Sequence, residues 1–105
     1  MDIFIRERSF IAKIAAFILK GKRMAVTINN TICLHNCTRE NFMKDKRWLA
    51  HEIAHVLQYK KIGTLRFIIL YLRESLLKGY KNNRFEIEAR AKEEDSGLLS
   101  NMRFV

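Results

Sequence analysis

Residues 48–58 decide the fold, and they read Trp48-Leu49-Ala50-His51-Glu52-Ile53-Ala54-His55-Val56-Leu57-Gln58. Apolar residues surround the ionisable ones on nearly every side, which predicts a buried helix. Positions i and i+4 of a helix share a face, so His51 and His55 can bind the same tetrahedral Zn²⁺ ion. Glu52 lies about 100° around the helix from His51, too far to be a ligand but within reach of a water bound to the metal. The pattern predicts a zinc site with a general base on the same turn, and a core helix with hydrogen-bonded histidines is the alternative.

The composition indicates a single globular domain over residues 1–105. Hydrophobic residues make up 49% of the chain and charged residues 30%, which is typical of a folded rather than a disordered protein. The net charge of +9 would suit a nucleic acid or an anionic membrane surface. The 20 lysines and arginines are spread along the chain, however, and their short clusters match no nucleic-acid-binding module. We therefore expect a solvated basic surface and no nucleic-acid partner.

Cys33 and Cys37 flank His35 in a spacing that resembles half of a zinc site, but the sequence has no second pair to complete it. A strand over residues 31–35 would also place the two sulfurs badly for a disulfide. We expect both thiols to be reduced, and hence a cytoplasmic protein. The apolar run at residues 67–72 is far shorter than the roughly 20 residues of a membrane span, so no transmembrane segment is expected. The N-terminal segment does not fit a signal peptide either.

The first half of the chain predicts one helix and two strands. Apolar residues at helical spacing predict an amphipathic helix over residues 10–20 that packs on the core, with a membrane-surface helix as the alternative. Residues 24–28 and 31–35 have the pattern of strands, and the two asparagines between them favour a hairpin. At a sheet edge near the zinc, this hairpin would bind an extended peptide as an added strand; an ordinary covered edge is equally compatible with the pattern.

The second half predicts three helices and a tail. The zinc helix begins between Asn41 and Asp45 and runs to residue 62, a second helix capped by Thr64 covers about 65–78, and a third covers 84–92. The predicted fold class is therefore α+β: a small zincin-like domain with about four helices packed on a small sheet or hairpin, followed by a C-terminal tail.

A catalytic zinc usually has three protein ligands and a water, so one more ligand is needed. The candidates are the two cysteines, His35 and the late acidic residues. Glu86 follows Asn83 at the spacing of a capping box, which would turn it back towards the start of its helix. Glu88 falls within the arc of apolar residues around Ala89, and a lone inward carboxylate requires a cation. The pattern favours Glu88 as the third ligand, and an inward Glu88 paired with a basic side chain is the alternative.

With His51-Glu52-x-x-His55 on one helix and Glu88-Ala89 on a later one, the chain resembles the gluzincin group of zinc metallopeptidases. Its length and the order of its elements are similar to those of the minigluzincins, single-domain proteins of this size. The resemblance covers roughly residues 9–94. It implies a zinc-dependent metalloendopeptidase that hydrolyses peptides or unfolded proteins, with one Zn²⁺ ion held by His51, His55 and Glu88. Glu52 would take a proton from the zinc-bound water and pass it to the leaving amine.

The resemblance carries two further expectations. The strand at residues 31–36 would form the upper rim of the substrate cleft. Members of the group often have a Tyr or His that stabilises the oxyanion, and here we expect Tyr80, with Tyr59 and Tyr71 as alternatives.

The C-terminal segment, residues 97–105, is apolar and follows a break at Ser96-Gly97. The resemblance implies that it is a latency tail, which occupies the cleft of its own molecule or self-associates with another copy. A tail that completes the core is the alternative. The alternative to an enzyme is a non-catalytic, zinc-stabilised basic module that binds a nucleic acid or a protein.

Overall fold

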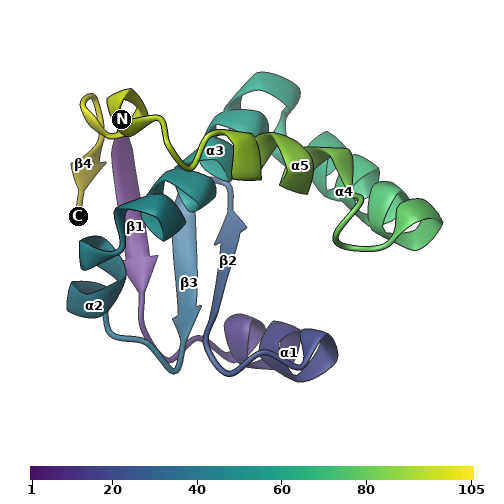
Figure 1. Cartoon of the computed structure of the whole chain (residues 1–105), viewed down its shortest axis with the longest axis horizontal. Helices are drawn as coiled ribbons and strands as arrows, with labels where there is room; N and C mark the ends of the chain where they lie inside the picture. The colour runs from purple at the N-terminus through teal and green to yellow at the C-terminus, as the bar shows by residue number, and fades with distance from the viewer.

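A mixed sheet of four strands supports five α-helices in the part of the chain that the structure describes (Figure 1). The structure is a computed structural model, and it describes residues 1–105 except for the side chain of Ser96. The strands are β1 (Asp2–Arg6), β2 (Met24–Ile28), β3 (Thr31–His35) and β4 (Arg103–Phe104). Their order is β2-β3-β1-β4, with β1 parallel to β3 and β4, and β2 antiparallel to β3. The two edges of the sheet are therefore β2 and β4.

All of the α-helices except α4 begin at a capping side chain, and each of the five ends at a change in backbone direction. They are α1 (Phe10–Leu19), α2 (Arg39–Lys44), α3 (Lys46–Ile62), α4 (Thr64–Lys78) and α5 (Arg84–Ala91), followed by the short 3₁₀ helix η1 (Ser96–Leu99). Asp45 caps α3 by accepting a hydrogen bond from the Trp48 amide at 3.1 Å. Gly63 and Gly79 have positive φ angles of 101° and 81°, which a glycine adopts without steric cost. They turn the chain between α3, α4 and α5.

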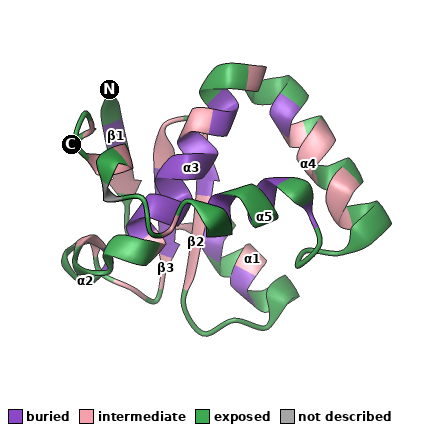
Figure 2. Cartoon of the chain, turned by 45° about the horizontal axis from the view of Figure 1, so that its top comes forward, coloured by how far each residue is buried: buried purple, intermediate pink, exposed green. Residues whose placement is uncertain are grey.

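The main hydrophobic core lies between the sheet and the α2–α3 pair. Ile3, Ile32 and Leu34 of the sheet are fully buried against Phe42 of α2 and the apolar face of α3. A second cluster joins α3, α4 and α5 through aromatic side chains. Figure 2 shows α3 as the most continuously buried helix of the chain. Because core contacts surround α3, its polar residues are held in one orientation.

The α+β fold class is confirmed, and so are most of the predicted elements. The helix at 10–20, the hairpin of β2 and β3, and the two later helices lie close to where the sequence places them. The predicted start of the zinc helix divides into α2 and α3, and Thr64 lies inside α4 rather than capping it. The strands β1 and β4, which lie at the two ends of the chain, were not predicted.

One prediction about the edges of the sheet needs correction. The strand at 31–36, expected at the cleft rim, is β3, and it is covered by β2 on one side and β1 on the other. The edge beside the predicted zinc site is β2.

No helix within the described residues has both the length and the apolar composition needed to cross a membrane.

The expectation that residues 97–105 block the cleft of their own molecule is wrong for this structure. Arg103 and Phe104 form β4, which pairs with β1 at the edge of the sheet opposite β2. The Arg103 amide donates to the Met1 carbonyl and the Val105 amide to the Ile3 carbonyl, both at 2.8 Å. Apolar residues of the segment pack on the main core. The tail is therefore part of the sheet and the core, because β1 offers it a free edge.

Candidate metal centre

The predicted motif places its three ionisable side chains together. His51, Glu52 and His55 are buried, and their ligand atoms lie within 4.8 Å of one another. The two imidazole rings are 5.0 Å apart between centroids and nearly perpendicular. The group can hold a metal ion, as the His-Glu-x-x-His spacing predicts.

A third carboxylate meets both histidines, and it is Glu86 rather than Glu88. Nε2 of His51 lies 2.9 Å from Glu86 Oε1, and Nε2 of His55 lies 3.2 Å from Glu86 Oε2. Glu86 is 3% exposed. Glu88 is exposed, and its Oε1 accepts a hydrogen bond from Gln58 Nε2 at 2.9 Å. The prediction that Glu88 joins the histidines is therefore contradicted by this geometry.

The helix cap explains why Glu86 is free to face inwards. Asn83 caps α5 without help from Glu86, because the Asn83 side chain accepts the Phe85 amide at 2.9 Å. The Glu86 carboxylate has turned to the histidines. The Tyr71 hydroxyl of α4 donates a hydrogen bond to Glu86 Oε2. Glu86 and Ala89 follow one another at i and i+3, so they share one face of α5, and Glu93 lies in the turn just after the helix. That spacing, with Ala89 as its apolar member, is the signal that could have selected Glu86.

Glu93 and Gln58, which the sequence pattern did not predict, contact the Nδ1 atoms of the two imidazoles. Nδ1 of His51 lies 2.8 Å from Glu93 Oε2, and Nδ1 of His55 lies 2.8 Å from Gln58 Oε1. Gln58 in turn donates to the Phe85 carbonyl at 3.0 Å and to Glu88. Acceptors at Nδ1 keep the proton there and leave the Nε2 lone pairs for a metal. Gln58 follows His55 by three positions, so its place on the same face could be expected.

Glu52 stands beside the histidines with one oxygen occupied. Thr27 of β2 donates its hydroxyl to Glu52 Oε1 at 2.8 Å. Burial raises the pKa of Glu52 above its ordinary value, although both histidines and the Thr27 hydrogen bond oppose this. A carboxylate with a raised pKa is a better proton acceptor near neutral pH.

The histidines and Glu86 stabilise each other's charges. Burial alone would lower the pKa of both imidazoles, but the hydrogen bond to Glu86 and the charge of Glu52 outweigh it. The pKa of His51 is raised, and that of His55 rises to about 9. The same hydrogen bonds lower the pKa of Glu86 well below its ordinary value, although burial opposes them. Without metal, the site holds protons in the place where a cation would bind.

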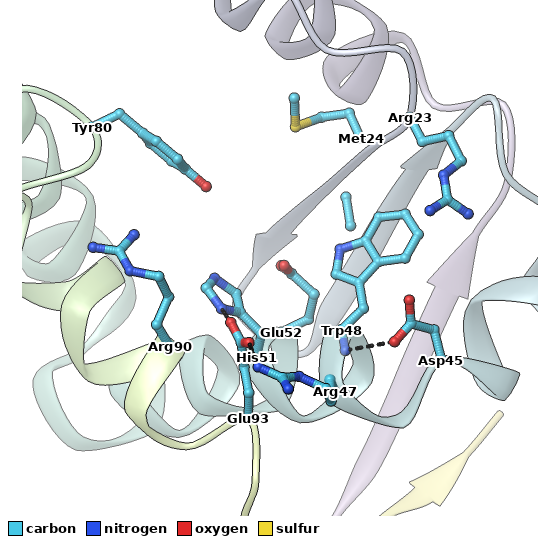
Figure 3. Close-up of a pocket in the computed structure, with 11 residues that line it drawn as sticks. Arg23, Met24, Asp45, Arg47, Trp48, His51, Glu52, Tyr80, Arg90 and Glu93 are labelled. Carbon is cyan, nitrogen blue, oxygen red and sulfur yellow. Dashed lines mark hydrogen bonds and ion pairs between the residues drawn. The ribbon is translucent and has the colours of Figure 1, made fainter.

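The three tyrosines named as oxyanion candidates have different surroundings. Tyr59 packs in the aromatic cluster with its centroid 4.3 Å from that of Phe67, and burial raises its pKa to about 12. Tyr71 is engaged with Glu86. The Tyr80 hydroxyl points into the cleft near His51 and Glu52 (Figure 3). Burial and the charges of Glu86 and Glu52 raise the pKa of Tyr80, so its hydroxyl stays neutral and can donate.

Two cavities meet at Glu52. A polar cavity of about 610 Å³ contains His51, Trp48 and several charged residues (Figure 3). An apolar cavity of about 570 Å³ lies between α1, β2 and α4 and contains His55 and Glu86. Met24, Ala25, Glu52 and Tyr80 line both cavities. The candidate metal centre therefore faces one continuous cleft with a polar end and an apolar end, and the edge strand β2 runs along it.

The other proposed ligands lie outside the group. Cys33 and Cys37 are free thiols. Cys33 is buried on β3, and Cys37 Sγ donates weakly to the Thr38 carbonyl at 3.5 Å. His35 is the last residue of β3. Within the described residues, these three are not part of the metal-binding group.

Comparison with known proteins gives one match. A family model described as the eCIS core domain matches residues 14–63, slightly less than half of the chain. The eCIS core domain is a domain of contractile injection systems and is grouped with the zincin-like proteins. The matched segment contains α3 with its complete motif and ends before Glu86. No curated protein and no solved structure matches the chain significantly.

Proposed function

We propose that the protein is a zinc-dependent metallopeptidase of the gluzincin type, with His51, His55 and Glu86 as the metal ligands. The observation that carries this proposal is the convergence of two imidazole nitrogens on one buried carboxylate, with each imidazole held from behind by a second acceptor. The match to a zincin-like family over α3 agrees with it.

The residues present fit Zn²⁺ in kind and in spacing. Zinc bonds of about 2.0–2.1 Å in a tetrahedral site place neighbouring ligand atoms about 3.3 Å apart. The histidine nitrogens lie 2.9 Å and 3.2 Å from the oxygens of Glu86. A histidine pair with a carboxylate is also the ligand set of hydrolytic zinc sites. The three side chains would therefore bind the ion with small adjustments.

The other residues of the cleft would carry the proton transfers. Zn²⁺, when bound, supplies a Lewis acid that polarises a carbonyl and lowers the pKa of a water. Glu52 accepts the proton of the attacking water at Oε2, since Thr27 occupies Oε1, and delivers it to the leaving amine. The Tyr80 hydroxyl donates to the oxygen on which negative charge develops.

The substrate class follows from β2. This edge strand has unpaired backbone groups on the side that faces the cleft, so an extended peptide can align along it. Extended backbone is available in peptides and in unfolded proteins, but seldom in folded ones. We therefore propose peptides and unfolded proteins as substrates.

The decisive experiment compares the wild type with Glu52→Gln. Zinc content and cleavage of casein are measured for both, with Glu40→Gln as the matched control because Glu40 is an exposed residue of α2. We expect one zinc per chain in all three proteins. The rate of casein cleavage should fall by about 100-fold or more in Glu52→Gln alone. Equal cleavage by wild type and Glu52→Gln would contradict the proposal.

A second candidate is a non-catalytic module that uses the metal for stability. It is favoured by one observation: the two histidines lie on α3 and Glu86 lies on α5, so an ion held by these three side chains would cross-link the two helices. One zinc per chain with no cleavage by any variant would select this candidate.

A further inference from the structure

Helix α4 carries an apolar stripe on the side that faces away from the core. Leu65, Ile69, Leu72 and Leu76 are all exposed and follow the spacing i, i+4, i+7 and i+11. At about 100° per residue, they occupy an arc of about 60°. Leu76 is 87% exposed. The opposite face of α4 packs on the core through Phe67, so the stripe is a second apolar face.

Helix α1 has the same arrangement. Phe10, Ile14 and Phe17 follow the spacing i, i+4 and i+7 on its outer face, and Phe17 is 86% exposed. The inner face of α1 is buried through Ala12 and Ala16. The large side chains of this helix therefore point outwards and the small ones inwards, the reverse of a helix that only supports a core.

The two helices flank one opening. Ile18 and Leu19 of α1 line the apolar cavity together with Ile68 and Leu72 of α4. Both views place α1 and α4 on the side of the molecule away from β4 (Figures 1 and 2). A flat apolar surface that touches both helices would also cover the apolar mouth of the cleft.

The charges beside the stripes are basic. Lys13 of α1, and Arg66 and Arg73 of α4, lie within about 60° of the stripe on their own helix. Helix α1 contains no acidic residue. Helix α4 contains one, Glu74, which lies on the opposite face, where it accepts the Arg84 amide at 3.0 Å and pairs with Lys78. The stripes thus have cationic borders and no anionic side chain among them.

We propose that this α1–α4 face binds an anionic membrane surface. The apolar stripes would enter the boundary between headgroups and acyl chains, and the adjacent lysine and arginines would contact lipid phosphates. The net charge of +9 favours a membrane over a second copy of the chain as the binding partner. A second copy would bring like charges together, whereas an anionic bilayer carries the complementary charge. This binding does not depend on the peptidase proposal.

The test is sedimentation of the whole chain with vesicles. Pure phosphatidylcholine vesicles are compared with vesicles of phosphatidylcholine and phosphatidylserine. We expect binding to the anionic vesicles that weakens as the salt concentration is raised. The double variant Phe17→Ser/Leu76→Ser should bind these vesicles about tenfold more weakly, or weaker still. Ile87→Ser is the matched control, because Ile87 is an exposed apolar residue on α5. Arg66→Glu/Arg73→Glu should weaken binding similarly, whereas Lys46→Glu/Lys92→Glu should weaken it much less.

Circular dichroism of each variant separates loss of binding from loss of folding. Phe17 and Leu76 are almost fully exposed, so the double variant should keep the wild-type spectrum and melting temperature. Three results would overturn the proposal: no binding to anionic vesicles, equal binding by the double variant and Ile87→Ser, or a concentration-dependent dimer in solution that the double variant abolishes.

Discussion

Glu86 and Glu88 lie two positions apart on α5, and their carboxylates face different surroundings. A separation of two residues is about 200° around a helix, so when one points at the histidines the other points away. Glu86 is buried against His51 and His55. Glu88 is exposed and accepts a hydrogen bond from Gln58. Two residues of one chemical type thus form a natural matched pair.

Zinc affinity should separate the members of this pair. We expect Glu86→Gln to weaken Zn²⁺ binding by at least about 100-fold, because it removes a charged ligand from a buried site. Glu88→Gln should change the affinity by less than about tenfold, since it alters only a partner of Gln58. Competition with a fluorescent chelator measures both. A larger loss of zinc affinity in Glu88→Gln than in Glu86→Gln would instead identify Glu88 as the third ligand, as the sequence pattern predicts.

At the scale of elements, the joint between α4 and α5 decides where the third carboxylate stands. Asn83 is fully buried there. Its Oδ1 accepts the Phe85 amide, and its Nδ2 donates to the Tyr71 carbonyl at 3.0 Å and to Ser75 Oγ at 2.9 Å. One side chain therefore both begins α5 and ties it to α4.

Asn83→Ala should accordingly destabilise the protein. The loss of the cap and of two part-buried hydrogen bonds is expected to lower the free energy of unfolding by roughly 2–4 kcal/mol. Urea unfolding followed by circular dichroism measures the change. Asn82→Ala is the control, because Asn82 is exposed and donates only to the Lys78 carbonyl at 3.3 Å. Equal stability of the two variants would show that the joint is held by other contacts.

The elements also show what the sequence could reveal. The motif helix and the β2–β3 hairpin have local signals, namely apolar periodicity, a capping Asp45 and a turn at Asn29, whose φ is 56°. The orientation of α5 has no such local signal, because it depends on the contacts of Glu86 and Asn83 with Tyr71 of α4. A capping-box spacing is present at Glu86, yet two histidines and a tyrosine offer that carboxylate stronger hydrogen bonds than a backbone amide does.

The strands show the same division between local and distant signals. The edge position of β2 could not be assigned from the hairpin alone, since either strand of a hairpin can lie outermost. It depends on β1, which pairs with β3 some 27 positions further along (Phe4 with Thr31). Pairing between distant segments is decided by the whole chain rather than by local pattern.

At the scale of the whole molecule, stability should depend on pH through the metal site. His55 has a pKa of about 9 in the folded protein and about 6.5 when unfolded. Its contribution is fully present below about pH 6.5 and is lost as the pH rises through about 9. The metal-free protein should therefore melt at a lower temperature at pH 9.5 than at pH 6. Saturating zinc should reduce this difference, and an unchanged melting temperature across this range without metal would contradict the charge assignment.

Removing residues 102–105 tests the place of the tail. The truncation deletes β4 and the side chains of Met102 and Phe104, which pack on the main core. We expect a loss of roughly 1–3 kcal/mol in the free energy of unfolding and no gain in peptidase activity per folded molecule. Urea unfolding and casein cleavage measure the two effects. A rise in activity would favour the latency hypothesis instead.

The pairing of β1 with β4 also gives the folding reaction an order. The Met1 ammonium donates to the Asn101 carbonyl at 3.1 Å across a separation of 100 positions, whereas the β2–β3 hairpin closes over a two-residue turn. The entropy lost on closing a loop grows with its length, so the hairpin should form early and the β1–β4 pair late. His55 and Glu86 are 31 positions apart, an intermediate separation. Zinc bound during refolding would thus fix α5 against α3 before β4 pairs with β1.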